Sequence, residues 1–188
     1  VVNNVETFIA AAKITADGHK SFQQLGTAQS SGTRLLSISG DCSKPGIYEY
    51  PFGTSITTIL DDCQASDTSF VQIGGPSGTM VDKNSFQRTI CFEDLPTGGS
   101  FMIFNHSRDP LETALNFSHF FAHESCGFCT PCRVGSSLIK KLLDKINNGL
   151  GSQQDILELD KLCHLIQQNS HCGLGQTATN PVRDTLNI

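Results

Sequence analysis

The sequence predicts an α+β chain in which a strand-rich region precedes a small bundle of four helices. Short segments of strand composition, separated by turn residues, occupy residues 34–107. Segments with helix start signals and apolar residues at helical spacing occupy residues 108–188. With 38% hydrophobic and 16% charged residues, the chain can bury a core. We therefore expect four parts: a short helical piece at 1–25, a linker at 26–33, and these two regions.

The strand-rich region has one helix among its strands. Four segments combine strand composition with glycine, proline or serine nearby: 34–40, 46–52, 70–79 and 100–105. Residues 54–65 predict a short helix that Thr54 or Ser55 caps, with apolar residues at helical spacing. Strands around a single helix favour a small α+β domain.

The helical region opens with a clear start signal. Asp109 is an N-cap, Pro110 takes the first helical position, and Glu112 can reach back to the cap. The expected apolar face of this helix is Leu111, Ala114, Leu115, Ser118 and Ala122. Three further helices are expected: about Arg133 to Asn147, one opening at Ser152, and a short one opening at Asn180 and Pro181.

Composition and charge argue against several classes of protein. The net charge of −5 and the lack of a basic cluster argue against nucleic-acid binding. No apolar run approaches the length of a membrane span, and the first residues lack the features of a secretory signal. We expect a cytoplasmic protein with no membrane span. Because the chain begins with Val1, we also expect a fragment of a longer chain.

The eight cysteines favour metal or cluster binding over disulfides. Disulfide frameworks belong to small secreted chains with poor cores, which this chain does not resemble. Cys126, Cys129 and Cys132 stand at even gaps and supply three thiolates where soft metals usually need four.

The fourth ligand must lie elsewhere in the chain. The candidates are Cys42, Cys63, Cys91, Cys163 and Cys172. Cys163 and Cys63 fall on apolar helix faces, where a free cysteine is commonly a small buried hydrophobe. Cys172 sits in "HCGLGQ", just past a helix end, on an expected loop whose glycines let the backbone approach a bulky inorganic core. Cys172 is therefore the predicted fourth ligand.

The spacing favours a 4Fe–4S cluster over zinc. Structural zinc sites usually use two separated pairs of ligands, whereas three evenly spaced cysteines can wrap one corner of a cubane. A zinc-stapled interaction module stays as the alternative. Arg133, next to Cys132, could offset the negative charge of such a cluster, or could be a solvated helix residue.

Three histidines and one glycine turn are further candidates for a site. His119 and His123 are four residues apart and could form a metal pair, but no third ligand is evident, which favours surface or bundle histidines. His171 abuts Cys172 and is expected to support it rather than bind metal. Residues 74–78, "GGPSG", lack a Walker lysine and a following helix, which favours a simple turn.

Two motifs resemble a known family. "ESCGFCTPCRVG" (124–135) and "HCGLGQTATNPV" (171–182) resemble the C-terminal part of the NADH-oxidising, 51 kDa-type flavoprotein subunit of respiratory complex I. The same module occurs in diaphorase subunits of NAD-reducing NiFe hydrogenases and in NAD-dependent formate dehydrogenases. The resemblance covers the whole chain: 1–7 is similar to the end of the flavin-binding domain. Residues 34–107 are similar to the ubiquitin-like β-grasp (SLBB) domain, and 108–188 to the helical 4Fe–4S-binding domain.

The resemblance implies specific site residues. It implies that Cys126, Cys129, Cys132 and Cys172 hold a 4Fe–4S cluster. It also implies that the intact subunit binds FMN and NAD(H), with Asn3, Asn4 and Thr7 lining the FMN site; from the residues alone, these three are helix-start residues. The family's glycine-rich FMN and NADH segments are absent from this sequence, so we do not expect the fragment alone to be catalytic.

The resemblance also implies a function and partners. The chain would relay single electrons between FMN and partner iron–sulfur subunits of a diaphorase, hydrogenase or complex I assembly. Phe128, Val134 and the "SHCGLGQTA" segment favour the hydrogenase diaphorase. Complex I and formate dehydrogenase are the related alternatives, and a purely structural iron–sulfur domain is a further one.

Overall fold

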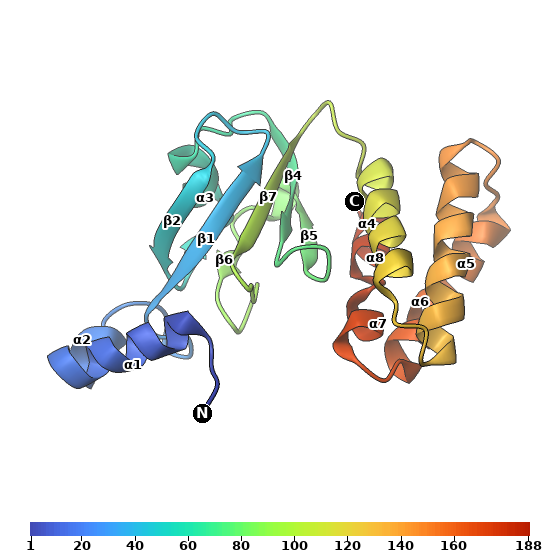
Figure 1. Ribbon diagram of the computed structural model, residues 1–188. Coiled ribbons are helices and arrows are strands. Elements are labelled where there is room, and N and C mark those ends of the chain that lie inside the picture. The colour runs from blue at the N-terminus through green and yellow to red at the C-terminus, as the bar shows by residue number, and fades with distance from the viewer.

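A computed structural model describes all 188 residues and divides them into an N-terminal helix pair, a sheet region and a helical bundle (Figure 1). Helices α1 (Val5–Asp17) and α2 (His19–Gln23) form the N-terminal pair, as expected for residues 1–25. The side chain of Asn4 caps α1 by accepting a hydrogen bond of 2.9 Å from the backbone N–H of Glu6. No residue of α1 is buried, so the pair lies on the surface of the sheet region.

The sheet has five strands in the order β2-β1-β7-β4-β5. Strand β1 runs parallel to β7, and the other neighbours are antiparallel. Their bounds are Thr33–Gly40 for β1, Gly46–Pro51 for β2, Thr68–Ile73 for β4, Thr79–Asp82 for β5 and Ser100–Asn105 for β7. The four expected strand segments are confirmed. The sequence did not predict β5, the small pair β3 (Thr54–Ser55) and β6 (Thr89–Ile90), or the 3-10 turn η1 (Lys83–Ser85).

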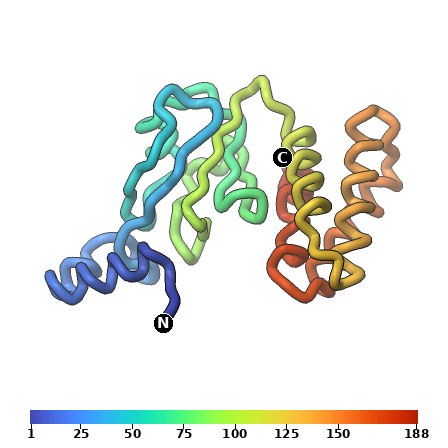
Figure 2. The backbone as a smooth tube through the Cα atoms, in the orientation of Figure 1, coloured from blue at the N-terminus to red at the C-terminus, as the bar shows by residue number.

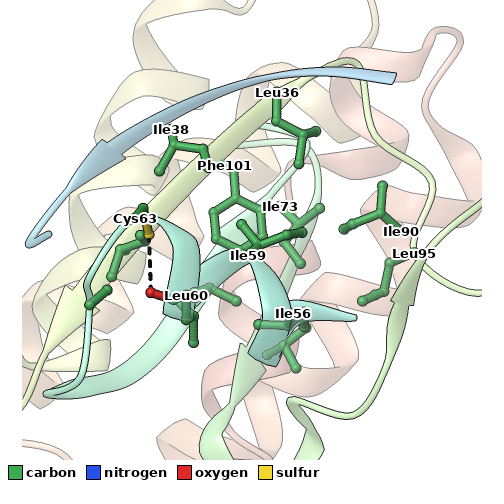
Figure 3. Close-up of a cluster of buried hydrophobic side chains, with 14 of the residues drawn as sticks. Leu36, Ile38, Ile56, Ile59, Leu60, Cys63, Ile73, Ile90, Leu95 and Phe101 are labelled. Carbon is green, nitrogen blue, oxygen red and sulfur yellow. Dashed lines mark hydrogen bonds between the residues drawn. The ribbon is translucent and has the colours of Figure 1, made fainter. Parts of the chain in front are cut away.

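Helix α3 (Ile56–Asp62) closes the core of the sheet region. Its cap is Ser55, whose Oγ accepts a hydrogen bond of 3.2 Å from the backbone N–H of Thr58. Ile56 and Ile59 of α3 are fully buried and pack in the same core as Phe101 of β7 (Figure 3). The helix therefore covers one face of the sheet through its apolar side.

Five helices form the C-terminal region. They are α4 (Pro110–Glu124), α5 (Thr130–Asn147), α6 (Gln153–Asn169), α7 (Gly173–Thr177) and α8 (Asn180–Thr185). The four expected helices are confirmed, with α5 starting three residues earlier than the expected Arg133. The expected loop after Cys172 is wrong, because Gly173–Thr177 is helical. Gly175 explains the difference. A Cβ at this position would lie 2.4 Å from Ser170 Oγ, so the glycine is needed for close packing and not for a flexible loop.

The expected apolar face of α4 is only partly correct. Ala114 and Ser118 are buried as expected, but Phe117 and Phe121 are buried too. These two rings pack with Ala178 against partly buried Met102 and Phe104, both on β7, so α4 is buried against the sheet as well as against the bundle. The expected cap is Asp109, whose carboxylate accepts from the backbone N–H of Leu111 at 2.8 Å. The reach-back from Glu112 does not form.

The bundle is fixed to the sheet at two places. The carboxylate of Asp184 on α8 accepts a hydrogen bond of 2.8 Å from the backbone N–H of Met80 on β5. Arg108, just before α4, donates from Nε to Asp41 at 3.0 Å. The sheet and the bundle are therefore joined by hydrogen bonds and by packing, as well as by the connecting chain.

A capping box starts α6 and gives the bundle a pH-dependent contact. Asp155 accepts from both the backbone and the side chain of Ser152, and Lys145 Nζ lies 2.7 Å from its carboxylate. The ammonium of Lys145 and these hydrogen bonds lower the pKa of Asp155 to about 2. Because the pKa is depressed in the folded state, the ionised carboxylate stabilises the fold at neutral pH.

We predict that Asp155→Asn lowers the urea midpoint of unfolding at pH 7. The difference in midpoint between wild type and variant should be largest above about pH 5 and should shrink as the pH falls toward about 2. The reason is that the Asp155 carboxyl of the unfolded chain takes up a proton at a higher pH than that of the folded chain. Urea titrations followed by circular dichroism at several pH values measure this. Asp160→Asn is the control, since that exposed carboxylate faces only His164 on its own helix, at 3.7 Å. Equal midpoints for wild type and Asp155→Asn at pH 7 would contradict the prediction.

Candidate metal centre

Three cysteines follow one another along the α4–α5 connection and the first turn of α5. Cys126 is exposed, Cys129 is half-buried, and Cys132 is buried. Cys129 is the N-cap residue of α5, and none of the three forms a disulfide. The segment thus presents free thiols that run from the surface to the interior at the start of one helix.

The fold brings Cys172 to the same end of the bundle. Cys172 is the N-cap residue of α7 and is exposed. Its neighbour His171 packs edge-on against Phe128, with ring centroids 5.7 Å apart. Figure 2 shows the α4–α5 connection and the α6–α7 connection together at the lower end of the bundle. The distant fourth cysteine therefore lies on a segment that contacts the segment of the first three.

Backbone N–H groups favour the thiolate form of Cys129. Interactions with the backbone N–H groups of His171 and Cys132 lower the pKa of this thiol. The larger contribution comes from His171, which belongs to the distant segment. N–H donors directed at sulfur also stabilise a metal-bound thiolate. The sequence did not predict this influence of His171 on Cys129, because it comes from backbone groups and not from a side-chain pattern.

Cys132 is held by close packing between α5 and α7. A Cβ on Gly175 would lie 3.1 Å from the Cβ of Cys132, so a larger residue would crowd the two helices. The Oγ of Ser125 lies 3.3 Å from the sulfur of Cys132. The Oγ of Ser170 is buried without a hydrogen-bond partner beside Gly175. The "CGLG" spacing hinted at Gly175, whereas nothing in the sequence distinguished Ser125.

The donor set fits a polynuclear sulfur-ligated group. Four free thiols are available, and at least one of them is biased toward the thiolate. No three His, Cys, Asp or Glu side chains are arranged around a point that a single metal ion could occupy. A zinc ion requires each sulfur about 2.3 Å from one centre, whereas an iron–sulfur core spreads its ligands over several metal atoms. Four sulfur donors are the donor set that a 4Fe–4S cluster requires.

Arg133 places a positive charge beside the cysteines. Its guanidinium donates to the carbonyl of Gly127, and a second nitrogen lies 3.4 Å from Thr130 Oγ1. Gly127 has φ +75°, a backbone conformation that favours glycine. In this conformation its carbonyl accepts the hydrogen bond from Arg133 on α5. No carboxylate pairs with Arg133, so its charge remains available to offset a nearby anion.

The other cysteines lie away from this segment. Cys163 is fully buried in the bundle core, where burial raises the pKa of its thiol to about 12. Cys63 is fully buried in the sheet core, so the expectation for both as buried hydrophobes is confirmed. Cys42 and Cys91 also belong to the sheet region.

His119 and His123 are surface residues of α4. His119 Nε2 lies 3.6 Å from Asp144, and His123 Nδ1 lies 3.0 Å from Glu124. They line a hollow of about 580 Å³ together with Lys140 and other residues, and no third metal ligand joins them. Both are therefore surface histidines with carboxylate neighbours, which is the alternative that the sequence favoured.

The three residues expected at a flavin site lie at the N-terminus and in the first turn of α1. Asn3 Oδ1 accepts from the backbone N–H of Asn4 at 2.8 Å, and Asn4 caps α1. Thr7 lines a groove of about 420 Å³ between α1 and β1, beside Arg34. The structure therefore shows Asn4 in the helix-start role that the residues alone indicate.

No helix is both long enough and apolar enough to span a bilayer.

Comparisons with known proteins agree with this site. Residues 112–188 match a family described as the NADH-ubiquinone oxidoreductase-F iron-sulfur binding region. The NAD-reducing hydrogenase HoxS subunit alpha of Cupriavidus necator is 42% identical over 186 residues, covering 98% of this chain and 31% of that protein. An NADH-quinone oxidoreductase subunit of Aquifex aeolicus is 34% identical, covering 99% of this chain and 45% of that protein.

A solved structure shows the same fold. The crystal structure of an NAD+-reducing NiFe-hydrogenase in the H2-reduced state superposes with a TM-score of 0.94 at 42% identity, covering 100% of this chain and 33% of that one. The chain spans 31% to 45% of the length of these relatives. The match confirms the predicted 4Fe–4S cofactor. Residues 112–188 thus form the iron–sulfur binding region of this family, and the chain corresponds to the C-terminal part of the NADH-oxidising, 51 kDa-type flavoprotein subunit.

Proposed function

We propose that the chain relays single electrons through a 4Fe–4S cluster that Cys126, Cys129, Cys132 and Cys172 hold, as part of an NADH-oxidising flavoprotein subunit. One observation carries this proposal: the ring of His171, next to Cys172, packs edge-on against the ring of Phe128, which lies between Cys126 and Cys129. This contact brings the fourth thiol to a segment where the other three already lie, although the two segments are distant in sequence.

The residues around the thiols have separate roles in this proposal. The backbone N–H groups of His171 and Cys132 favour the thiolate form of Cys129 by lowering its pKa. Gly175 lets α7, which begins after Cys172, approach the first turn of α5, which carries Cys132. The guanidinium of Arg133 offsets the negative charge of a four-thiolate site. A bound 4Fe–4S cluster supplies one-electron redox chemistry there.

The surface side of the site is the proposed exit for electrons. Cys126 is exposed, and the neighbouring Phe128 is 78% exposed. An exposed apolar side chain beside a redox centre suits a contact with another protein. We propose partner iron–sulfur subunits of the same assembly in that role, by analogy with relatives that are named as subunits. A cytoplasmic location remains a prediction from the sequence.

The sheet region fits the β-grasp (SLBB) description. A mixed five-stranded sheet with a parallel β1–β7 pair packs against α3. Its proposed role is mechanical: it positions the bundle through Asp41 and Met80. The domain boundaries at 34–107 and 108–188 follow this division and remain a proposal. Four main helices with the short α7 make up the proposed cluster-binding bundle.

The proposed parent is the diaphorase of an NAD-reducing hydrogenase. The 42% identity to HoxS subunit alpha exceeds the 34% identity to the Aquifex aeolicus oxidoreductase, which supports this branch over complex I. A formate dehydrogenase is the remaining related alternative. FMN contacts by Asn3, Asn4 and Thr7, NAD(H) binding and hydride transfer are proposals for the intact subunit, and the fragment alone is not proposed to be catalytic.

We predict that Cys172→Ala abolishes the cluster, because a 4Fe–4S core requires a thiolate on each iron. Iron and sulfide analysis, together with visible absorbance that dithionite bleaches, measures the loss. Cys163→Ala is the matched control, since that cysteine is buried in the bundle core and should leave the cluster in place.

Two results would overturn this proposal. Loss of the cluster in Cys163→Ala with retention in Cys172→Ala would reject the ligand assignment. Stoichiometric zinc without iron in the wild-type protein would support the zinc-stapled module instead.

We predict that Arg133→Gln shifts the reduction potential of the cluster to more negative values. Removing a nearby positive charge destabilises the more negative, reduced form, by an amount on the order of tens of millivolts at protein-like dielectric constants. EPR spectra recorded during a redox titration measure the shift. Lys161→Gln removes an exposed charge on α6 and serves as the control.

An unchanged or more positive potential in Arg133→Gln would show that Arg133 is only a solvated helix residue. If the wild-type cluster is not reduced at physiological potentials in the same titration, the site is structural and does not relay electrons.

A further inference from the structure

The sheet region contains two cysteines that the proposed cluster does not use, and the backbone holds them side by side. Cys42 lies in the turn after β1, and Cys63 ends α3. The N–H of Lys44 donates to the carbonyl of Cys63 at 3.0 Å, and the N–H of Ser43 donates to the carbonyl of Gln64 at 3.3 Å. These two hydrogen bonds pair the segments in antiparallel fashion. The two cysteine side chains therefore come from adjacent, paired stretches of backbone.

The two thiols differ in their access to solvent. Cys63 is fully buried in the sheet core, and its thiol donates to the carbonyl of Leu60 at 3.5 Å (Figure 3). Cys42 packs against that same core but is partly exposed and lines an open hollow of about 470 Å³. One thiol thus lies inside, and the other lies between it and the surface.

The backbone at this contact has an unusual conformation. Gln64 has φ +56° and is the one non-glycine residue of the chain with a positive φ. The left-handed backbone conformation of Gln64, directly after Cys63, reverses the chain so that it runs beside the turn that carries Cys42. Such conformations are costly and persist where the surrounding structure enforces them.

We propose that Cys42 and Cys63 form a redox-active dithiol, which a small disulfide such as oxidised glutathione converts to an intramolecular disulfide. The thiolate of Cys42 attacks one sulfur of oxidised glutathione, forms a mixed disulfide and releases one glutathione. The thiolate of Cys63 then attacks the Cys42 sulfur and releases the second glutathione. The two protein thiols lose two electrons and two protons in total, and oxidised glutathione gains them.

The inside–outside arrangement suits this exchange. A thiolate displaces a leaving thiol through a mixed disulfide, with the attacking and leaving sulfurs on opposite sides of the sulfur under attack. Cys63 lies on the inner side of Cys42, and glutathione can leave through the hollow on its outer side. Burial, and then the neighbouring Cys42, raise the pKa of Cys63 to about 11. The second step should therefore be slow near neutral pH and faster as the pH rises.

The disulfide would act at the point where the sheet holds the bundle. Asp41, next to Cys42, accepts from Arg108 Nε at 3.0 Å and from the backbone N–H of Asn105 at 3.1 Å. Both donors belong to the chain that leads into the bundle. A link from Cys42 to α3 would therefore stiffen the turn that anchors this connection, and it does so whether or not the chain relays electrons.

Peptide mapping of the cluster-loaded protein after anaerobic incubation with oxidised glutathione tests the proposal. Trypsin leaves 35–83 as one peptide because Pro45 follows Lys44, so cleavage at Glu49 is needed to separate the two cysteines. We expect a Cys42–Cys63 cross-linked pair that dithiothreitol resolves. The Cys63→Ser variant should instead keep glutathione on Cys42, and Cys42→Ser should show neither product.

A control variant and a stability measurement accompany the peptide mapping. Cys91→Ser removes another buried cysteine of the sheet region and should cross-link like the wild type. Thermal unfolding should show a higher midpoint for oxidised than for reduced wild type, and no such rise in Cys63→Ser. A lasting glutathione adduct on Cys42 in the wild type, or its pairing with any other cysteine, would overturn the proposal. The wild-type result decides the question even if a variant fails to fold.

Discussion

The packing of the His171 ring against the ring of Phe128 joins the two halves of the metal centre. One half lies on the α4–α5 connection, and the other at the start of α7. The contact requires α7 to lie close to α5, which a side chain at Gly175 would prevent. The α6 helix must then have the right length to return the chain to this end of the bundle, and its buried face, including Leu159 and Ile166, keeps it there.

The same arrangement explains why α4 is more buried than an ordinary bundle helix. The face of α4 that is turned toward the sheet carries Phe117 and Phe121, which contact side chains of β7. Asp184 at the other end of the bundle reaches the backbone of Met80 on β5. Burial raises the pKa of Asp184, while the Met80 N–H acts in the opposite direction. The bundle thus packs on the sheet along α4 and α8, leaving the cysteine end free of the sheet (Figure 1).

Local signals in the sequence were sufficient to predict which cysteines gather at one end of the bundle and where most helices and strands lie. The even spacing of Cys126, Cys129 and Cys132 and the strong caps at Asp109 and Ser152 are short-range features, which a sequence displays directly. The α7 helix was missed because glycine has poor helix propensity, and only its packing against α5 makes this segment helical. Strand β5 and the buried rings of α4 depend on partners distant in sequence.

The hydrogen bonds between Asp41 and Arg108 also limit how far the bundle can move from the sheet. The connection from β7 to α4 covers only residues 106–109, and Arg108 within it is tied to the turn after β1 by two hydrogen bonds of 3.0 and 2.9 Å. A long flexible tether would let the bundle sample many separations from a neighbouring redox group. Because the connection is short and held by these hydrogen bonds, the sheet acts as a rigid spacer. In the proposed electron relay, the fold of the sheet would therefore set the tunnelling distance, which a flexible linker would leave variable.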